Sequence, residues 1–504
     1  MDAFLWVGAI AIGLGLAFTW SARAVAWRSG LVDSPDGRRK IQTQPVAVVG
    51  GLALLASTSI TILVGCLVSD RVLEAVVSDF RAPLALVVAG TIIAGVGLAD
   101  DIFNLRARYK LIGQFLAISV LVFGGDYRIS DISLFGGAAD LGWLSIPITF
   151  LWFLAAVNAL NLLDGMDGML ASVGVMICAS LAVMAFEHNH PLEGFVALAL
   201  AGGLIGFLRF NFPPATVYLG DSGSMLVGLT IAALATHASL KGPTLAVASP
   251  LALLILPFTD TAAAIVRRKL TGRGIAIGDR GHLHHVLQKR GLTRLRTLIL
   301  VAALSSIASI GALTSTLLHN DLAAFAAAFC IGAILLSGGL FGAAEMRLIR
   351  ERGRGMLKSM RGQVAPVEME VRLQGSADWA ELWHQITGQA EVLNLASVCL
   401  DVNAPVWHEG YHRRWARKGA DGDQLSVWRV ELPLLGHGQL IGRLSVSGSR
   451  DQECIAEKLV AFSRIVERAE ALASEISRPA AMASNSGEYA PVLTIDRTPL
   501  SASA

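Results

Sequence analysis

The sequence is poor in charge, and this scarcity decides its class. Of its 504 residues, 16% are charged and 54% are hydrophobic, whereas an ordinary soluble domain has about 25% charged residues. A helix crosses the bilayer core with about 20 predominantly apolar residues. The chain offers eleven charge-free runs near that length: 3–22, 41–69, 82–99, 111–125, 141–163, 168–186, 194–208, 222–240, 242–259, 297–320 and 322–344. So many runs in succession exclude a soluble protein with a few buried core helices.

Cysteine is scarce as well. The five cysteines are scattered along the chain and form no CxxC pair, which argues against both a disulfide framework and a zinc site. The first apolar run also lacks the basic residues that precede a cleaved signal peptide. We therefore expect residues 3–22 to remain as the first membrane span.

The basic residues that do occur orient the predicted spans. Most of them lie in alternate loops, with the first group between Arg23 and Lys40 and the largest between Arg267 and Arg296. Loops rich in lysine and arginine stay on the cytoplasmic side. The sequence thus predicts an all-α polytopic membrane protein of about eleven transmembrane helices, with its N-terminus outside and its C-terminus in the cytoplasm.

The character of the chain changes after the last apolar run. We expect a transmembrane catalytic domain over 1–344, a basic linker over 345–366, a small cytoplasmic α/β domain over 367–477 and a disordered tail over 478–504. The α/β domain loosely resembles sensor modules of the GAF type. Its predicted elements are strands at 367–373 and 395–402, helices at 378–393 and 453–476, and a hairpin of 425–434 with 439–446.

Polar clusters in the membrane part fall at the ends of the apolar runs, on the side assigned to the cytoplasm. They are Asp100-Asp101 after the third run, Asn158-Ala-Leu-Asn-Leu-Leu-Asp-Gly-Met-Asp-Gly168 around the end of the fifth, Gly220-Asp-Ser-Gly-Ser224 at the start of the eighth and Asp279-Arg-Gly-His-Leu-His-His285 before the tenth. Carboxylates at the membrane are costly and mark function by default. Several of them at one face repel each other unless a cation neutralises them, and hard oxygen ligands together with phosphates suit Mg²⁺.

In this order and on one side, these motifs resemble the polyprenyl-phosphate N-acetylhexosamine-1-phosphate transferase family, over residues 1 to about 344. The branch that uses undecaprenyl phosphate and UDP-N-acetylglucosamine is indicated by the Asp279–His285 and Asn158–Asp167 motifs. The resemblance implies a bacterial inner-membrane enzyme that transfers a sugar phosphate and releases UMP. It implies Mg²⁺ as cofactor, with Mn²⁺ as a substitute, and lipopolysaccharide, O-antigen or other cell-envelope glycans as the products served.

The resemblance also assigns roles to residues of this sequence. It implies a metal site at Asn161 and Asp221 with Asp101 nearby, and a lipid-phosphate acid at Asp100. Catalytic or charge-stabilising groups are expected at Asp100, Asp101, His282, His284 and His285. Substrate contacts are expected at Lys40, Asp164, Asp167, Asn211, Tyr218 and Arg280, with Tyr218 against uracil.

Some alternatives stay open at this point. Asp100 either accepts a proton from the lipid phosphate or orients it, and Asp260 is expected to pair with Arg267 or another basic group. The family's histidine after Arg39-Lys40 is replaced by Gln42. The same chemistry on UDP-MurNAc-pentapeptide is one alternative, and a secondary transporter, whose sites lie near the bilayer midplane, is another. A homodimer is left open, and no nucleic-acid partner is expected.

Overall fold

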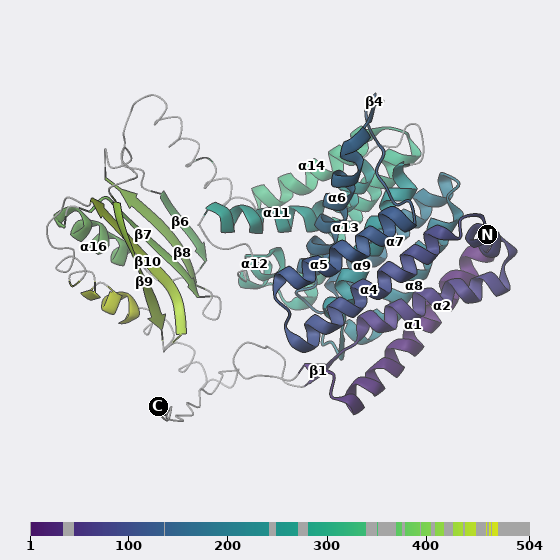
Figure 1. Cartoon of the computed structure of the whole chain (residues 1–504), viewed down its shortest axis with the longest axis horizontal. Coiled ribbons are helices and arrows are strands. Elements are labelled where there is room, and N and C mark those ends of the chain that lie inside the picture. The colour runs from purple at the N-terminus through teal and green to yellow at the C-terminus, as the bar shows by residue number, and fades with distance from the viewer. Residues whose placement is uncertain are drawn as a thin grey trace. The chain divides into compact units, whose positions relative to one another are not determined.

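The structure of the chain is a computed structural model (Figure 1). It describes residues 2–33, 45–135, 137–240, 248–270, 281–338, 350, 369–374, 379–393, 395–404, 409–417, 427–436, 439–449, 460, 463–464 and 466–471. Two compact units emerge. The first comprises residues 1–34, 44–264 and 282–341, and the second contains the C-terminal residues from 342 onward together with 35–43 and 265–281.

A bundle of helices makes up the first unit, except that residues 265–270 at the end of one helix are assigned to the second unit. The helices are α1 (Asp2–Ser29), α2 (Gly50–Val68), α3 (Asp70–Ser78), α4 (Arg81–Phe103), α5 (Ala107–Ser119), α6 (Ser145–Leu163), α7 (Met169–Glu187), α8 (Pro191–Asn211), α9 (Gly220–Leu240), α10 (Ala248–Leu253), α11 (Ile255–Leu270), α12 (Leu283–Lys289), α13 (Arg294–Leu317) and α14 (Asp321–Ser337). A π-helical turn, Val120–Gly124, extends α5.

Short strands connect some of these helices. Strands β1 (Val32–Asp33), β2 (Val46–Val48) and β5 (Val217–Tyr218) form a three-stranded sheet in the order β1-β2-β5. β2 and β5 are parallel, with Val48 opposite Tyr218. Strands β3 (Asp131–Leu134) and β4 (Gly137–Asp140) form a separate antiparallel hairpin. The first sheet fixes the start of α9 next to the start of α2, because each helix begins two residues after its strand.

Helix boundaries follow from local chemistry. Asn104 adopts a left-handed conformation (φ 50°) and ends α4, with its N–H donating to the carbonyl of Asp100 at 2.8 Å. Asparagine tolerates this conformation better than most residues. The side chains of Thr293 and Asn320 accept backbone N–H groups at the starts of α13 and α14, as capping residues do.

Eight helices among the described residues are long and apolar enough to cross a membrane. They are Trp6–Ser29, Gly50–Val68, Arg81–Phe103, Ala107–Gly124, Gly142–Leu163, Met169–Glu187, Pro191–Asn211 and Arg294–Leu317, and Asp321–Ser337 is a shorter apolar helix. The prediction of a mostly helical multi-pass membrane protein is therefore confirmed. The number eleven stays a prediction: the run 222–240 is helical as α9, and 242–259 is covered by α10 and α11 only from residue 248.

The second unit contains a five-stranded antiparallel sheet in the order β6-β8-β7-β10-β9. The strands are β6 (Met369–Gln374), β7 (Ser397–Ala404), β8 (Glu409–Ala416), β9 (Val427–Gly436) and β10 (Gln439–Ser449). Helix α16 (Trp379–Val392) packs on the sheet (Figure 1), and its Trp379 and Trp383 are buried with Leu400 and Val446. This confirms a small strand-containing C-terminal region, while its likeness to GAF modules stays a prediction.

One strand of this sheet is absent from the elements predicted from the sequence. β8 lies between β6 and β7, and Tyr411 and Trp415 on its core-facing side are buried. Arg413, between them, faces the same way, and its guanidinium lies over the Trp383 ring, 5.6 Å from the centroid, within the distance of a cation–π contact. Because a charged residue occupies a core-facing position, β8 lacks the alternation of apolar and polar residues by which strands are recognised in a sequence.

Candidate functional site

The first turn of α9 is held against α2 and α4 by contacts that only glycine permits. A Cβ atom on Gly97 of α4 would lie 2.4 Å from the Cα of Ser222. A Cβ on Gly51 of α2 would lie 2.3 Å from the backbone nitrogen of Gly223. Any larger residue at either position would displace the backbone of α9. The position of Asp221 relative to α4 is consequently set by backbone contact.

Asp101 ties the same turn to α4. Its carboxylate accepts the backbone N–H of Asp221 at 2.9 Å and that of Ser222 at 3.3 Å. The first N–H groups of a helix lack partners within the helix, and a carboxylate there also interacts favourably with the helix dipole. Gly220, just before, has a positive φ of 68° that favours glycine. Asp101 thus caps α9 from another helix.

Lys110 on α5 joins the two carboxylates that the sequence placed at separate motifs. Its ammonium donates to the Oδ2 atom of Asp100 at 2.9 Å and also to the carboxylate of Asp221. Sequence reasoning missed this role, because Lys110 stands with Arg106 and Arg108 between two apolar runs and resembles an ordinary cytoplasmic basic residue. Its spacing of ten residues from Asp100, across the short turn between α4 and α5, is the indication that could have found it.

Asn161 brings α6 into the same cluster. Its Nδ2 group donates to the Oδ1 atom of Asp221 at 2.8 Å and to the hydroxyl of Ser224 at 2.8 Å. Asn158, one turn earlier, exchanges hydrogen bonds with Gln114 of α5. Helices α4, α5, α6 and α9 are neighbours in the bundle (Figure 1). Polar side chains near one end of each of these helices therefore contact one another. We call Asp100, Lys110, Asn161 and Asp221 the central cluster.

The loop after α6 adds two further carboxylates. Burial, with the nearby carboxylates of Asp221, Asp101 and Asp167, raises the pKa of the Asp164 carboxyl well above its usual range. Asp167 accepts the N–H of Ala215 at 3.1 Å and lies 3.7 Å from the guanidinium of Arg294. Carboxyl groups are therefore crowded at this loop, and a bound cation would favour their ionised forms.

Asn211, at the end of α8, and Tyr218, in β5, lie close to the loop that follows α6. Asn211 is buried; its Oδ1 atom accepts the N–H of Gly168 at 2.9 Å, and its amide donates to the carbonyl of Val217 at 2.9 Å. Asn211 therefore braces the acidic loop against β5. Tyr218 is half-buried at the end of β5, where burial and then the carboxylates of Asp167 and Asp33 raise the pKa of its phenol to about 12.

The three histidines lie at the start of α12. His282 contacts Asp260 of α11, with 3.1 Å between its Nδ1 atom and Oδ2, so the basic group that pairs with Asp260 is a histidine. The His284 ring lies against the acidic loop, since a Cβ on Gly165 would be 2.4 Å from its Cε1 atom. The ring centroid of His285 lies 4.1 Å from that of His284.

His284 has distinctive properties within this group. It is buried, and among the described residues neither ring nitrogen has a hydrogen-bond partner. Burial, followed by the charge of His285, lowers the pKa of the His284 imidazole to about 3. The ring is therefore neutral at physiological pH and offers one donor and one acceptor. A buried imidazole with unused nitrogens beside a loop is suited to bind a polar ligand.

The structure therefore brings together eleven of the predicted site residues in the first unit: Asp100, Asp101, Asn161, Asp164, Asp167, Asn211, Tyr218, Asp221, His282, His284 and His285. Lys40 and Arg280, the other two, lie outside the described residues. All eleven lie at or next to helix ends. This location differs from the midplane sites of secondary transporters.

The oxygen donors fit a magnesium ion. Within the described part of the chain no three His, Cys, Asp or Glu side chains form a ready-made metal cage. Mg²⁺ does not require one, because it is usually bound through one or two carboxylates together with substrate phosphates and water. Asp100 and Asp221 converge on a single ammonium, and the carboxyl groups of Asp101 and Asp164 lie close enough to each other that, besides burial, Asp101 raises the pKa of Asp164. This cluster can therefore accommodate a cation in addition to the ammonium of Lys110.

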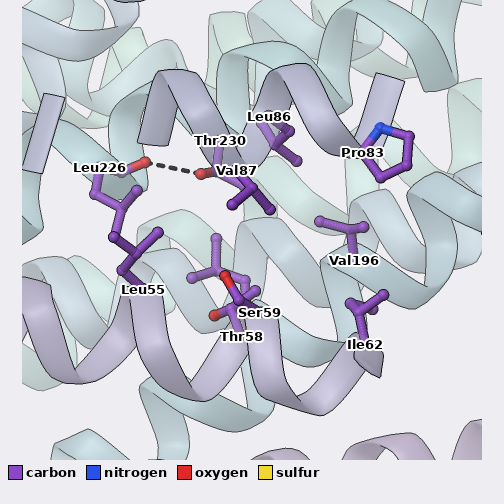
Figure 2. Close-up of a pocket in the computed structure, with 11 residues that line it drawn as sticks. Leu55, Thr58, Ser59, Ile62, Pro83, Leu86, Val87, Val196, Leu226 and Thr230 are labelled. Atoms are coloured by element: carbon purple, nitrogen blue, oxygen red, sulfur yellow. Dashed lines mark hydrogen bonds between the residues drawn. The ribbon is translucent and has the colours of Figure 1, made fainter. Parts of the chain in front are cut away.

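A separate pocket of about 90 Å³ lies among α2, α4, α8 and α9 (Figure 2). Its walls are mainly apolar, and the hydroxyl of Thr230 donates to the carbonyl of Leu226 at 2.9 Å. None of the described residues that line it belongs to the predicted site. The polar cluster at the helix ends and this apolar pocket are distinct features of the bundle.

Comparison with known proteins shows a family and several relatives to which the chain is similar. The family described as Glycosyl transferase family 4 matches residues 83–239. A Bacillus subtilis protein named probable undecaprenyl-phosphate N-acetylglucosaminyl 1-phosphate transferase is 31% identical over 300 residues, covering 59% of this chain and 81% of that protein. The decaprenyl-phosphate N-acetylglucosaminephosphotransferase of Mycobacterium tuberculosis is 33% identical over 349 residues, covering 64% and 83%.

A third relative belongs to the other branch considered above. The phospho-N-acetylmuramoyl-pentapeptide-transferase of a Thermoanaerobacter species is 33% identical over 212 residues, which is 40% of this chain and 63% of that protein. The family model covers the part of the chain that carries the central cluster. The chain belongs to glycosyl transferase family 4 and is a multi-pass membrane enzyme, a polyprenyl-phosphate N-acetylhexosamine-1-phosphate transferase.

Proposed function

We propose that the enzyme transfers N-acetylglucosamine-1-phosphate from UDP-N-acetylglucosamine to undecaprenyl phosphate, at the cytoplasmic face and with Mg²⁺. The observation that carries this proposal is the central cluster, where Asp100, Lys110, Asn161 and Asp221 meet at the helix ends. The choice of sugar rests on the relatives, since two of those most similar are named for N-acetylglucosamine. The pentapeptide-transferase matches over a smaller share of its own length.

In this reaction an oxygen of the lipid phosphate attacks the β-phosphorus of the UDP-sugar. The bond between that phosphorus and the bridging oxygen breaks, and UMP leaves with the electron pair. Such transfers depend on positioning and on charge stabilisation more than on covalent help from the protein. Mg²⁺, when bound by Asp221 and Asn161, supplies positive charge for the diphosphate and the leaving UMP.

The side chains of the central cluster then have separate tasks. Lys110 holds the carboxylates of Asp100 and Asp221 together and reduces their repulsion toward incoming phosphates. Asp101, which is engaged by two backbone N–H groups, positions Asp221. Asp100 orients the lipid phosphate, which is largely dianionic at pH 7 because its second pKa is about 6, so a proton acceptor is not required. His284 and His285 contribute hydrogen bonds to the nucleotide-sugar.

A donor panel tests the proposed substrate. We expect the purified enzyme, given undecaprenyl phosphate, to release UMP from UDP-N-acetylglucosamine and to form a lipid diphosphate sugar. UDP-MurNAc-pentapeptide should give at most a few per cent of that rate. Faster release of UMP from the pentapeptide donor would assign the enzyme to the other branch and overturn the proposal.

Removal of divalent metal should stop the reaction. Excess EDTA should reduce UMP release at least 100-fold, because the acidic cluster would then face the diphosphate with little beyond the charge of Lys110, and loss of one electrostatic stabiliser costs about 10²–10³-fold. Added Mg²⁺ or Mn²⁺ should restore turnover. Full turnover in EDTA, with metal content checked by elemental analysis, would rule out the metal role.

Tyr218 should act through its ring. Stacking of a base on an aromatic side chain is worth about 1–3 kcal/mol, so Tyr218→Ala should raise the KM for the UDP-sugar about tenfold or more. The phenol, with a pKa raised to about 12, remains protonated throughout the neutral range, and the loss should not vary with pH there. Tyr218→Phe is the matched control and should change KM less than threefold. Equal damage from both variants would show that the hydroxyl matters instead.

A further inference from the structure

Asp260 is a carboxylate that has no task in the reaction described above, although it contacts one of the three histidines. It is buried in α11 within the membrane part of the chain, where an unpaired charge would be costly. Its two oxygens have different partners. Oδ1 accepts the backbone N–H of Leu283 at 3.0 Å, and Oδ2 contacts Nδ1 of His282 at 3.1 Å.

The first of these contacts fixes the start of α12. His282 occupies the N-cap position of that helix, but its own side chain makes no capping hydrogen bond. The carboxylate of Asp260 takes this role from a different helix, in the way that capping side chains satisfy the first N–H groups. Because His284 of α12 lies against Gly165, the contact also fixes α12 relative to the acidic loop.

The second contact fixes the chemistry of His282. An ionised carboxylate can only accept hydrogen bonds, so Nδ1 of His282 must carry the proton. In the neutral ring the opposite nitrogen, Nε2, is then an acceptor. The same contact fixes the orientation of the His282 ring. This ring is nearly parallel to that of His284, with an angle of 6° between the ring planes and 6.2 Å between the ring centroids. Orientation of an imidazole by a carboxylate is a common device in catalytic sites.

We propose that Asp260 is a positioning residue, which acts through His282 by fixing its ring and its protonated nitrogen and by capping the helix that carries the three histidines. This extends the proposed function, since it presumes that these histidines serve the nucleotide-sugar. Asp260 itself touches no reacting atom. Its effect on turnover must therefore vanish when the imidazole of His282 is absent.

Asp260→Asn separates the two contacts. The asparagine Oδ1 still accepts the N–H of Leu283, so α12 keeps its cap. The amide Nδ2 is a donor and requires Nδ1 of His282 to be an acceptor, which shifts the proton to Nε2. We expect a thermal midpoint close to that of the wild type and a kcat lowered about 10–100-fold, as for other residues that orient a site histidine. Asp260→Ala should lose the cap as well and lower the thermal midpoint.

A double-mutant cycle gives the decisive measurement. In the His282→Ala background, Asp260→Asn should reduce kcat less than twofold further. Selective ¹⁵N-histidine labelling should show the proton of His282 on Nδ1 in the wild type and on Nε2 in Asp260→Asn. A wild-type kcat in Asp260→Asn, or in His282→Ala, would overturn the proposal, as would losses that multiply in the double variant.

The chain provides a matched control at the other end of α9. Glu193 of α8 and His237 are likewise a buried carboxylate–imidazole pair, with 2.8 Å between Oε1 and Nδ1. Glu193→Gln should lower the thermal midpoint but leave kcat and KM unchanged. The rate of each variant is compared with the wild-type rate, and both are measured with the UDP-N-acetylhexosamine that the wild type uses fastest. A different preferred sugar would thus revise the proposed substrate without affecting the test of Asp260.

Discussion

Asp221→Asn should lower kcat by about 10²–10³-fold, the loss expected when a group that stabilises transferred charge is removed. The carboxylate of Asp221 meets the ammonium of Lys110 and the amide of Asn161, and it is the acid whose position is fixed by backbone contacts of α9. The asparagine has the same shape and can still accept the hydrogen bond from Asn161. Insertion into the membrane and thermal midpoint should therefore stay near those of the wild type.

Asp321→Asn is the control for this variant. Asp321 begins α14, and its carboxylate also accepts a backbone N–H, that of Phe135 at 2.6 Å. The substitution removes the same charge from a position outside the central cluster, so turnover should be unchanged. UMP release and thermal unfolding in detergent are the measurements. An Asp221→Asn enzyme that keeps half of its turnover would contradict the assigned role of this carboxylate.

Lys110→Met should be nearly as damaging, with kcat at least 100-fold lower. Methionine retains most of the apolar length of lysine but removes the ammonium that joins Asp100 and Asp221. The two carboxylates would then repel each other and the incoming phosphates. Because the side chain of Lys110 is only 23% exposed, water would compensate only in part.

Arg108→Met is the matched control, since it removes one positive charge from the same turn of α5. Arg108 is exposed, and its guanidinium lies over the ring of Tyr109 at 4.8 Å. Its loss should change kcat less than threefold. Raising the Mg²⁺ concentration should rescue part of the Lys110→Met defect if the defect is one of charge. Equal losses from both variants would mean that the general basicity of the loop, and not Lys110, matters.

The sequence predicted the membrane class, the family and the grouping of the acidic motifs, because each depends on composition or on local spacing. It could not predict that Lys110 joins Asp100 to Asp221, since that contact spans 111 residues of the chain. Nor did it show that Asp101 would cap α9. A capping residue normally lies just before its own helix, and Asp101 comes from another helix altogether.

The roles predicted for Asn211 and Asp260 illustrate the same limit. Asn211 was expected to contact the substrate, which stays a prediction, and the sequence did not show that both ends of its buried amide are engaged by backbone groups of the loop and of β5. Asp260 was expected to pair with Arg267 or another basic group, and its partner proved to be His282. From the residue type and its position in the sequence, we could expect each of these two side chains to have a polar partner. The identity of the partner depends on tertiary packing, which a single sequence does not encode locally.

The glycine contacts of Gly51 and Gly97 bear on how this enzyme can change during evolution. They lock the first turn of α9 to two neighbouring helices through main-chain atoms, and packed interiors deform little. The spacing between the acids of α4 and α9 is therefore nearly invariant under side-chain substitution elsewhere. If the proposed function holds, adaptation to a new sugar donor is expected in parts that are not locked in this way, such as the loop from Asp164 to Gly168 and the histidine-bearing helix α12. The geometry of the acidic residues would then be conserved with the helices, while the specificity for the sugar could change.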